Sequence, residues 1–244
     1  MPMDPTSLRC YTAGYALPRP ELPDQLPRAV LGYFDDMTAF SYVRNHATDL
    51  LQVVRQTTIG LRSIRRMLRR HHLVLADVGA GDCALERDLL DVLEPDQHVK
   101  VFAVDASRRM LALNPVWYPS PYQVVNLVVA EADSTGLAGG HVDMSLALNV
   151  LPYVRDVSAV IDELIRITRP GGILAVANPV RDQFGFWERS FEGITLRFHD
   201  STERELKRPD LALVETKTVF LAPVAGVKSI SFPVARIVTL RVQS

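Results

Sequence analysis

The sequence has few cysteines, since only Cys10 and Cys83 occur in 244 residues and they lie far apart. Neither a disulfide framework nor a cysteine-based zinc site is therefore expected, and no metal site is predicted. Unpaired cysteines are typical of a reducing compartment, so we expect a cytoplasmic protein. The sequence also lacks the apolar core of a signal peptide and any run of about 20 apolar residues, so no membrane association is expected.

The sequence has no excess of charge of either sign. Its 27 Lys and Arg residues balance 28 Asp and Glu residues, which gives a formal net charge of -1. Nucleic acid is not an expected partner, because proteins that bind it usually carry a strong positive field. A cluster of arginines between residues 62 and 70 flanks an apolar stripe, and we interpret it as a solvated helix face, with phosphate contact as the alternative. The oligomeric state, monomer or homodimer, stays open.

Proline is unevenly distributed and divides the chain into segments. Residues 1–27 are rich in proline, which opposes regular structure and predicts an irregular N-terminal segment or flap. Residues 28–70 space their apolar side chains as helices do, which predicts a helical cap. Residues 71–244 then form the main domain, in which short apolar runs alternate with helical patterns.

Short apolar runs without polar alternation predict strands that are buried on both faces. They occur at 73–78, 99–104, 124–130, 144–148 and 173–177, with helical patterns at 84–93, 108–113 and 157–167. This alternation predicts an α/β fold with a Rossmann-like, doubly wound parallel sheet. Two further β-rich segments, 211–222 and 228–242, lie too close together for a crossover helix and predict an antiparallel hairpin. The expected sheet has seven strands, mostly parallel, with this hairpin at its C-terminal end.

A glycine-rich loop follows the first predicted strand. The stretch Gly79-Ala80-Gly81-Asp82-Cys83-Ala84 fits both the dinucleotide pattern G-x-G-x-x-G/A and the loop that binds S-adenosylmethionine (SAM). Asp105 ends the second strand, where an acidic side chain can bind the ribose of either ligand. Asp77 precedes the loop, and there it would attract the cationic SAM but repel a pyrophosphate. An NAD(P)-dependent oxidoreductase is therefore the less favoured interpretation.

Five consecutive motifs carry a resemblance to a known family. They are ADVGAGDCALERDLL, VFAVDASRRML, VVAEADSTGL, VDMSLALNVLPYVRDV and ELIRITRPGGILAVANP. In this order and spacing, between about residues 74 and 179, the chain resembles class I SAM-dependent methyltransferases, in the branch that acts on small molecules. It departs from the family at Cys83, where the common loop has a third glycine. A catalytic role for this cysteine would need a basic partner, and the sequence indicates none.

The resemblance implies SAM as cofactor and a role for each matching residue. The methionine end would be lined by Asp77, Gly79, Ala80 and Gly81, and the ribose would be bound by Asp105. The adenine would pack near Ala106 and Met110, and its amine would donate to Asp133, with Ser134 beside it. The reacting methyl would face Asn149.

Candidates for the acceptor side lie in segments where this family builds its substrate pocket. His46 and His199 are the candidate general bases, and Tyr15, Phe184, Phe186 and Trp187 are candidate walls of a substrate pocket. The expected function is methyl transfer from SAM to a small, natural-product-like molecule by in-line displacement. Two alternatives keep the fold: a SAM-binding enzyme that catalyses cyclisation or elimination, and a binding protein with a vestigial site. The acceptor atom, oxygen, nitrogen or carbon, is not indicated.

Overall fold

The computed structural model of the chain describes residues 47–90, 92–112, 121–180, 202–221 and 232–243. Several sequence predictions fall outside these residues. They are the irregular segment 1–27, the first part of the cap 28–70, the candidate bases His46 and His199, and the candidate substrate residues Tyr15, Phe184, Phe186 and Trp187.

The described strands form one seven-stranded sheet in the order β3-β2-β1-β4-β5-β7-β6. The strands are β1 (His72–Val78), β2 (His98–Asp105), β3 (Gln123–Val129), β4 (Val142–Leu148), β5 (Thr168–Pro179), β6 (Leu211–Leu221) and β7 (Phe232–Val242). The first five strands pair in parallel, whereas β7 pairs antiparallel with both β5 and β6. The predicted mostly parallel sheet with an antiparallel C-terminal hairpin is therefore confirmed.

The strand order reverses at β1, because β2 lies on one side of it and β4 on the other. Residues that follow β1 and β4 line one pocket at the carboxyl ends of these strands, where an open α/β sheet has its crevice. This edge of the sheet is where an open α/β fold binds its ligand. The opposite edge begins with His72 and His98, which are register partners and exposed.

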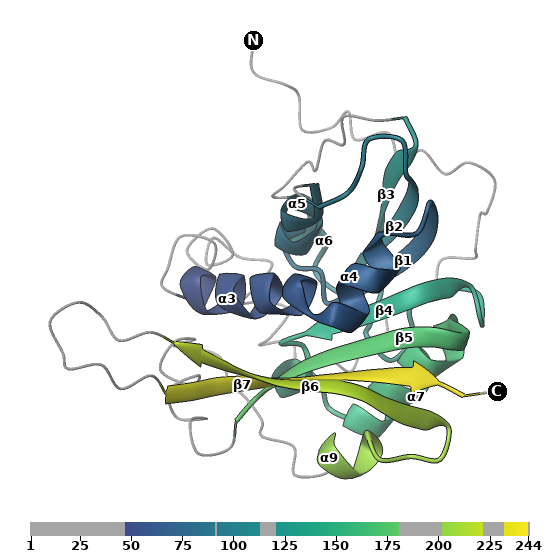
Figure 1. Ribbon diagram of the computed structural model, residues 1–244. Helices are drawn as coiled ribbons and strands as arrows, with labels where there is room; N and C mark the ends of the chain where they lie inside the picture. The colour runs from purple at the N-terminus through teal and green to yellow at the C-terminus, as the bar shows by residue number, and fades with distance from the viewer. Residues whose placement is uncertain (1–46, 91, 113–120, 181–201, 222–231, 244) are drawn as a thin grey trace, which may run out of the picture.

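Helices cover both faces of the sheet, which explains why its central strands are almost continuously apolar (Figure 1). The helices are α3 (Ala47–Gly60), α4 (Arg62–Leu68), α5 (Ala84–Leu90), α6 (Arg108–Ala112), α7 (Val157–Ile167) and α9 (Thr202–Glu205), with a 3-10 turn η1 (Leu151–Tyr153). One buried cluster joins α3, α4 and α5 to the sheet, and a second joins α7 to it. Within the described residues, no helix is both long enough and apolar enough to cross a membrane.

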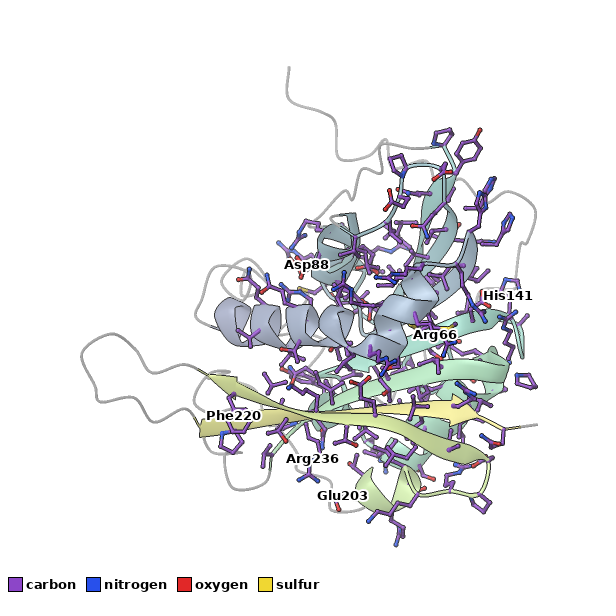
Figure 2. All side chains as sticks on the ribbon, viewed as in Figure 1. Arg66, Asp88, His141, Glu203, Phe220 and Arg236 are labelled. Carbon is purple, nitrogen blue, oxygen red and sulfur yellow. The ribbon has the colours of Figure 1, made fainter. Side chains whose placement is uncertain are left out.

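The helical pattern before β1 is interrupted at Leu61, which separates α3 from α4. Ile64, Met67 and Leu68 of α4 are buried in the same cluster as β1, so α4 packs directly on the sheet. The arginines of this segment are exposed, and Figure 2 shows Arg66 on the outer side of α4. This agrees with the interpretation of the arginine cluster as a solvated helix face.

Candidate functional site

A tight loop joins β1 to α5 at the carboxyl end of β1. Gly79 and Gly81 have φ angles of 79° and 56°, in the left-handed region that glycine enters without steric penalty. The N–H groups of Gly79 and Ala80 both donate to the carbonyl of Val104, at 2.7 and 2.9 Å, which holds the loop over the end of β2. A Cβ added at Gly79 would overlap Cγ2 of Val150. Glycine is therefore required here both for its conformation and for the close approach of the loop after β4.

Cys83 stands where the third glycine of related loops lies. Its φ of 56° is also left-handed, which costs a residue with a Cβ about 1–2 kcal/mol and explains why glycine is common there. The side chain is fully buried and packs with Ala80, Ala103 and Leu111. Burial, together with the nearby carboxylate of Glu86, raises the pKa of the thiol, so Cys83 stays protonated and unreactive.

Asp105, the last residue of β2, braces the glycine loop. Its Oδ2 accepts a hydrogen bond from the N–H of Gly81 at 2.8 Å, and its Oδ1 accepts from the N–H of Ser107 at 2.8 Å. The hydroxyl of Ser107 accepts in turn from the N–H of Met110 at 3.1 Å, in the first turn of α6. One carboxylate on the pocket wall thus fixes the loop against the beginning of the next helix.

Asp77 precedes the loop and lines the same pocket, although only 3% of its surface is exposed. Burial raises its pKa from 3.8 to about 7; the carboxylate of Asp105 adds to the increase, whereas the guanidinium of Arg55 opposes it. Burial also raises the pKa of Glu86, which is fully buried in the first turn of α5. This part of the site therefore carries acidic groups whose ionised form a bound cation would favour.

The segment after β3 brings residues 130–132 to the pocket. Burial, with a contribution from Asp133, raises the pKa of Glu131 to about 7. Its Oε1 is buried and has no hydrogen-bond partner among the described residues. Asp133 and Ser134 are exposed and do not line the pocket. Glu131 is therefore the acidic side chain that this segment presents to the pocket.

Glu163 of α7 holds the segment after β3 through hydrogen bonds to its carboxylate. Its carboxylate accepts from the N–H of Thr135 at 2.8 Å and from the hydroxyl of Thr135 at 2.5 Å. Arg166 donates to Glu163 at 2.6 Å and to the carbonyl of Leu137 at 2.7 Å. Burial alone would raise the pKa of Glu163, but the hydrogen bonds from Arg166 and Thr135 lower it. This ionised network ties the pocket segment to the helix that covers the sheet.

Asn149 follows β4 and lies on the pocket wall. Its φ of 62° is unusual for a residue with a side chain, and its N–H donates to the carbonyl of Ala177 at 3.1 Å. The side chain is buried, and Oδ1 has no partner within the part of the chain that the structure describes. A strained residue with an unpaired buried oxygen beside a pocket is a candidate for ligand contact.

Three residues of α3 also line the pocket, namely Leu51, Val54 and Arg55, and we call them the roof. Nε of Arg55 lies 3.0 Å from Oδ2 of Asp88 on α5, and Figure 2 shows Asp88 beside these two helices. The apolar spacing of this segment predicts a helix, and the resemblance implies that the cap lies near the acceptor, but no pattern in the sequence singles out these three residues as pocket contacts. Arg55 and the rest of the roof were missed for this reason.

Most of the predicted cofactor residues come together at this pocket. They are Asp77, Gly79, Ala80, Gly81, Asp105, Ala106, Met110 and Asn149, whereas Asp133 and Ser134 lie outside it. The residues that complete the lining include the roof, Glu131 and Tyr153. Among the described residues, no three His, Cys, Asp or Glu side chains form a group that could hold a metal ion.

Comparison with known proteins gives a family and a set of similar folds. Residues 76–176 match a family described as methyltransferase domain. No curated protein matches the chain significantly in sequence. A chain of the complex between the Haloferax volcanii Trm112 methyltransferase activator and a methyltransferase has a TM-score of 0.65 at 15% identity, with 88% of this chain and 97% of that chain covered.

Two other solved structures show what the fold can do. Magnesium protoporphyrin IX methyltransferase from Synechocystis, with S-adenosylhomocysteine bound, has a TM-score of 0.62 at 18% identity, with 88% of this chain and 98% of that chain covered. The cyclase SpnF has a TM-score of 0.55 at 14% identity, with 80% of each chain covered. At these identities the likeness shows the fold alone.

Residues 76–176 of the chain thus match the methyltransferase domain family, and the chain has the fold of solved SAM-dependent methyltransferases. The methyltransferase domain that the five motifs predicted is confirmed over residues 76–176, and the predicted fold is confirmed by its similarity to solved methyltransferases.

Proposed function

We propose that this protein transfers the methyl group of SAM to a small, natural-product-like acceptor by in-line displacement. The observation that carries the proposal is the pocket itself, in which Asp77, Asp105 and Glu131 stand at the ends of three neighbouring parallel strands around a glycine loop. SAM supplies an activated methyl on a positively charged sulfur, together with an ammonium, a ribose and an adenine. A carboxylate suits each of the last three groups, so the residues present fit the cofactor.

Each pocket side chain then has a role in binding. Asp105 accepts from the ribose hydroxyls while it holds Gly81 in place. Asp77 attracts the positively charged groups at the methionine end of SAM. Arg55 of the roof pairs with the carboxylate of that methionine end. Glu131 accepts from the adenine amine, the role that the resemblance implies for Asp133. Asn149 orients the reacting groups with its unpaired amide oxygen.

The protein's own part in the chemistry is alignment and the exclusion of water. Leu51 and Val54 of the roof, with Tyr153 after β4, provide an apolar cover to the pocket. The candidate bases His46 and His199 and the four aromatic candidates Tyr15, Phe184, Phe186 and Trp187 remain part of the proposal for the acceptor side. The proposal also includes a cytoplasmic protein, which its two distant cysteines support.

Titration calorimetry with SAM, S-adenosylhomocysteine and NAD tests the cofactor. We expect SAM and S-adenosylhomocysteine to bind, and NAD not to bind at the same concentrations. A dissociation constant for SAM above about 1 mM, or tighter binding of NAD, would overturn the proposal.

A second candidate function is a SAM-bound enzyme that catalyses cyclisation or elimination, and the cyclase SpnF favours it because its fold is similar. The two functions differ in the fate of the cofactor. Methyl transfer releases one S-adenosylhomocysteine for each product molecule, whereas cyclisation releases none. Quantifying S-adenosylhomocysteine against product, with acceptors drawn from small-molecule libraries, decides between them.

The affinity for SAM should fall as the pH drops below about 7. The pKa of Asp77 is raised to about 7, mainly by burial, so its carboxyl is largely protonated at pH 6 and must lose a proton to attract a cation. Each pH unit below this pKa then weakens binding by up to about tenfold. Calorimetry at pH 6 and pH 8, in buffers of different ionisation enthalpy, measures both the affinity and the released proton.

The stability of the free protein should change with pH in the opposite direction. The folded pKa of Asp77 lies above its unfolded value, so folding favours the protonated form. The cost of ionising Asp77 therefore builds up between about pH 4 and pH 7 and is complete above pH 7. Asp77→Asn should make both profiles less steep, and the remaining pH dependence would come from Glu131 and Glu86, whose pKa values burial also raises. Equal SAM affinity at pH 6 and pH 8 in the unchanged protein would contradict the assignment.

Glu131 and Asp133 provide a matched pair for the adenine contact. Glu131→Gln should weaken SAM binding about tenfold, since it replaces an acceptor for the adenine amine by an amide that offers fewer acceptor sites. Asp133→Asn changes the same charge two residues away on an exposed side chain and should leave the affinity within about twofold. Calorimetry on both variants checks this, and the reverse order would restore the adenine role to Asp133.

A further inference from the structure

We propose that Glu215, on strand β6 of the C-terminal hairpin, is a positioning residue for the cofactor pocket, because its carboxylate caps α4 and thereby holds the roof helix α3 in place. The inference rests on the proposed function, since it assigns the roof to the SAM site. It concerns a residue that lies outside the pocket lining and outside the five sequence motifs.

Helix α4 has no capping group of its own. Leu61 stands at its N-cap with an extended backbone and no side-chain hydrogen bond, and its first turn has no acidic residue. The N–H groups at the beginning of a helix need partners, and its partial positive charge favours an anion. Arginines occur throughout this short helix instead, which makes an anion from elsewhere in the fold more favourable.

Glu215 supplies this anion from a position 152 residues away along the chain. Its Oε2 accepts from the N–H of Ser63 at 3.2 Å and from the hydroxyl of Ser63 at 2.9 Å. Ser63 is the second residue of α4, so the carboxylate lies at the helix N-terminus. A charge-assisted bond of this kind contributes more than a neutral one.

Glu215 is itself held by the neighbouring strand β7. Thr239 is its register partner and is fully buried. The hydroxyl of Thr239 donates to the carbonyl of Glu215 at 3.1 Å, and it lies 3.3 Å from the hydroxyl of Ser63. Side chains from α4, β6 and β7 therefore form a single closed network.

The cap is linked to the roof by a short chain of contacts. The N–H of Leu61 donates to the carbonyl of Thr58 at 3.0 Å, and the buried hydroxyl of Thr58 donates to the carbonyl of Val54 at 2.8 Å. Only Leu61 separates α3 from α4, so a shift at Ser63 moves the end of α3. Val54 and Arg55 lie about one and a half turns before that end and line the pocket.

The test compares three variants of the full-length protein. Glu215→Ala should weaken SAM binding about five- to tenfold, because a loosened roof must be ordered again when the ligand binds. Glu215→Gln keeps an acceptor oxygen for Ser63 and should recover most of the affinity. Lys217→Ala changes an exposed charge on the same strand and should bind as the unchanged protein does.

Two further measurements separate positioning from a general loss of stability. In the ligand-free protein, amide hydrogen exchange in α3 should increase in Glu215→Ala, whereas exchange in α7 on the other face should not. In a double-mutant cycle, Glu215→Ala should weaken SAM binding less when Arg55→Ala is already present, because both act through the roof.

The outcomes are distinct. If the unchanged protein does not bind SAM, the proposed function fails, and exchange in α3 still decides whether Glu215 holds the roof. If SAM binds the unchanged protein and Glu215→Ala with equal affinity, the positioning role is overturned. The positioning role would also be overturned if amide exchange in Glu215→Ala rose equally in α3 and α7 and if the effects of Glu215→Ala and Arg55→Ala on SAM affinity were additive. Should Glu215→Ala fail to fold, amide hydrogen exchange in α3 is compared between Glu215→Gln and Thr239→Val instead. Thr239→Val removes the hydroxyl that holds Glu215, so exchange in α3 should increase in this variant. Unchanged exchange in α3 of Thr239→Val would overturn the positioning role.

Discussion

Asp105→Ala should lower the affinity for SAM about 100-fold or more, which is the largest effect that we expect from a single side chain of the pocket. The substitution removes the proposed acceptor for the ribose hydroxyls. It also removes two charge-assisted hydrogen bonds to the N–H groups of Gly81 and Ser107, each worth about 1.5–3 kcal/mol. Both the glycine loop and the beginning of α6 would then lose a hydrogen bond that holds them. Calorimetry with SAM measures the affinity, and thermal unfolding measures the loss of stability.

The control for this prediction is Asp96→Ala, which removes an exposed aspartate between α5 and β2 and should change neither quantity. Affinity of the Asp105→Ala variant within about threefold of the unchanged protein would remove Asp105 from the binding site, because one such bond alone exceeds that difference.

Gly79→Ala should lower the free energy of unfolding by about 2–5 kcal/mol and abolish SAM binding. The left-handed backbone at Gly79 costs alanine about 1–2 kcal/mol. The new Cβ would also overlap Cγ2 of Val150, and relief of such crowding typically costs about 1–3 kcal/mol. Because both loops form the pocket, their separation would distort it. Denaturant unfolding and calorimetry check the two parts of the prediction.

The chain offers a matched control in Gly171, whose φ of 76° is similar but whose Cβ would meet no atom within 4 Å. Gly171→Ala should therefore cost only the backbone penalty, about 1–2 kcal/mol. Adding Val150→Ala to Gly79→Ala should restore part of the lost stability by removing the colliding methyl groups. Equal losses for Gly79→Ala and Gly171→Ala would show that the contact with Val150 is unimportant.

The architecture was predictable from the sequence because β1, β4 and β5, in the middle of the sheet, are buried on both faces over most of their length. The two-sided burial expected for 124–130 is wrong, because Val124 and Leu127 of β3 are exposed. Continuous apolar runs such as Ile173–Ala177 are unfavourable in water, and the helical patterns between such runs leave few alternatives to a parallel sheet. The glycine loop was predictable for a similar reason. Its conformation depends on local backbone freedom, which two glycines in close succession make visible in the sequence.

The side chain that reaches the pocket after β3 was not predictable in the same way. The stretch Glu131-Ala132-Asp133 has two carboxylates, and the resemblance implies the adenine contact for Asp133. In the structure a bridge between Glu131 and Ser134 turns the chain, so Glu131 lies inside and Asp133 outside. Which of two alternating side chains points inward depends on this turn, and its sequence is not distinctive.

The roof and its cap were invisible to sequence analysis because both depend on contacts between distant segments. Arg55 lies beside the pocket through the packing of α3 against α5, and Glu215 reaches Ser63 only after the whole sheet has formed. The departure at Cys83 could be seen in the sequence but not explained by it. The left-handed backbone shows that the position favours glycine, and burial among apolar side chains compensates for the cysteine.

The position of β7 has a consequence for the order in which the protein acquires its structure on the ribosome. β7 follows β6 in the chain but lies between β5 and β6 in the sheet, so β6 has no strand to pair with until β7 has been synthesised. Glu215 is therefore translated before it can be held next to Ser63. Helix α3 is synthesised early, but it can pack in its final position only after β7 has been synthesised. We expect the nascent chain to have a formed central sheet and an open site, which closes in a late, slow step that depends on residues near 242.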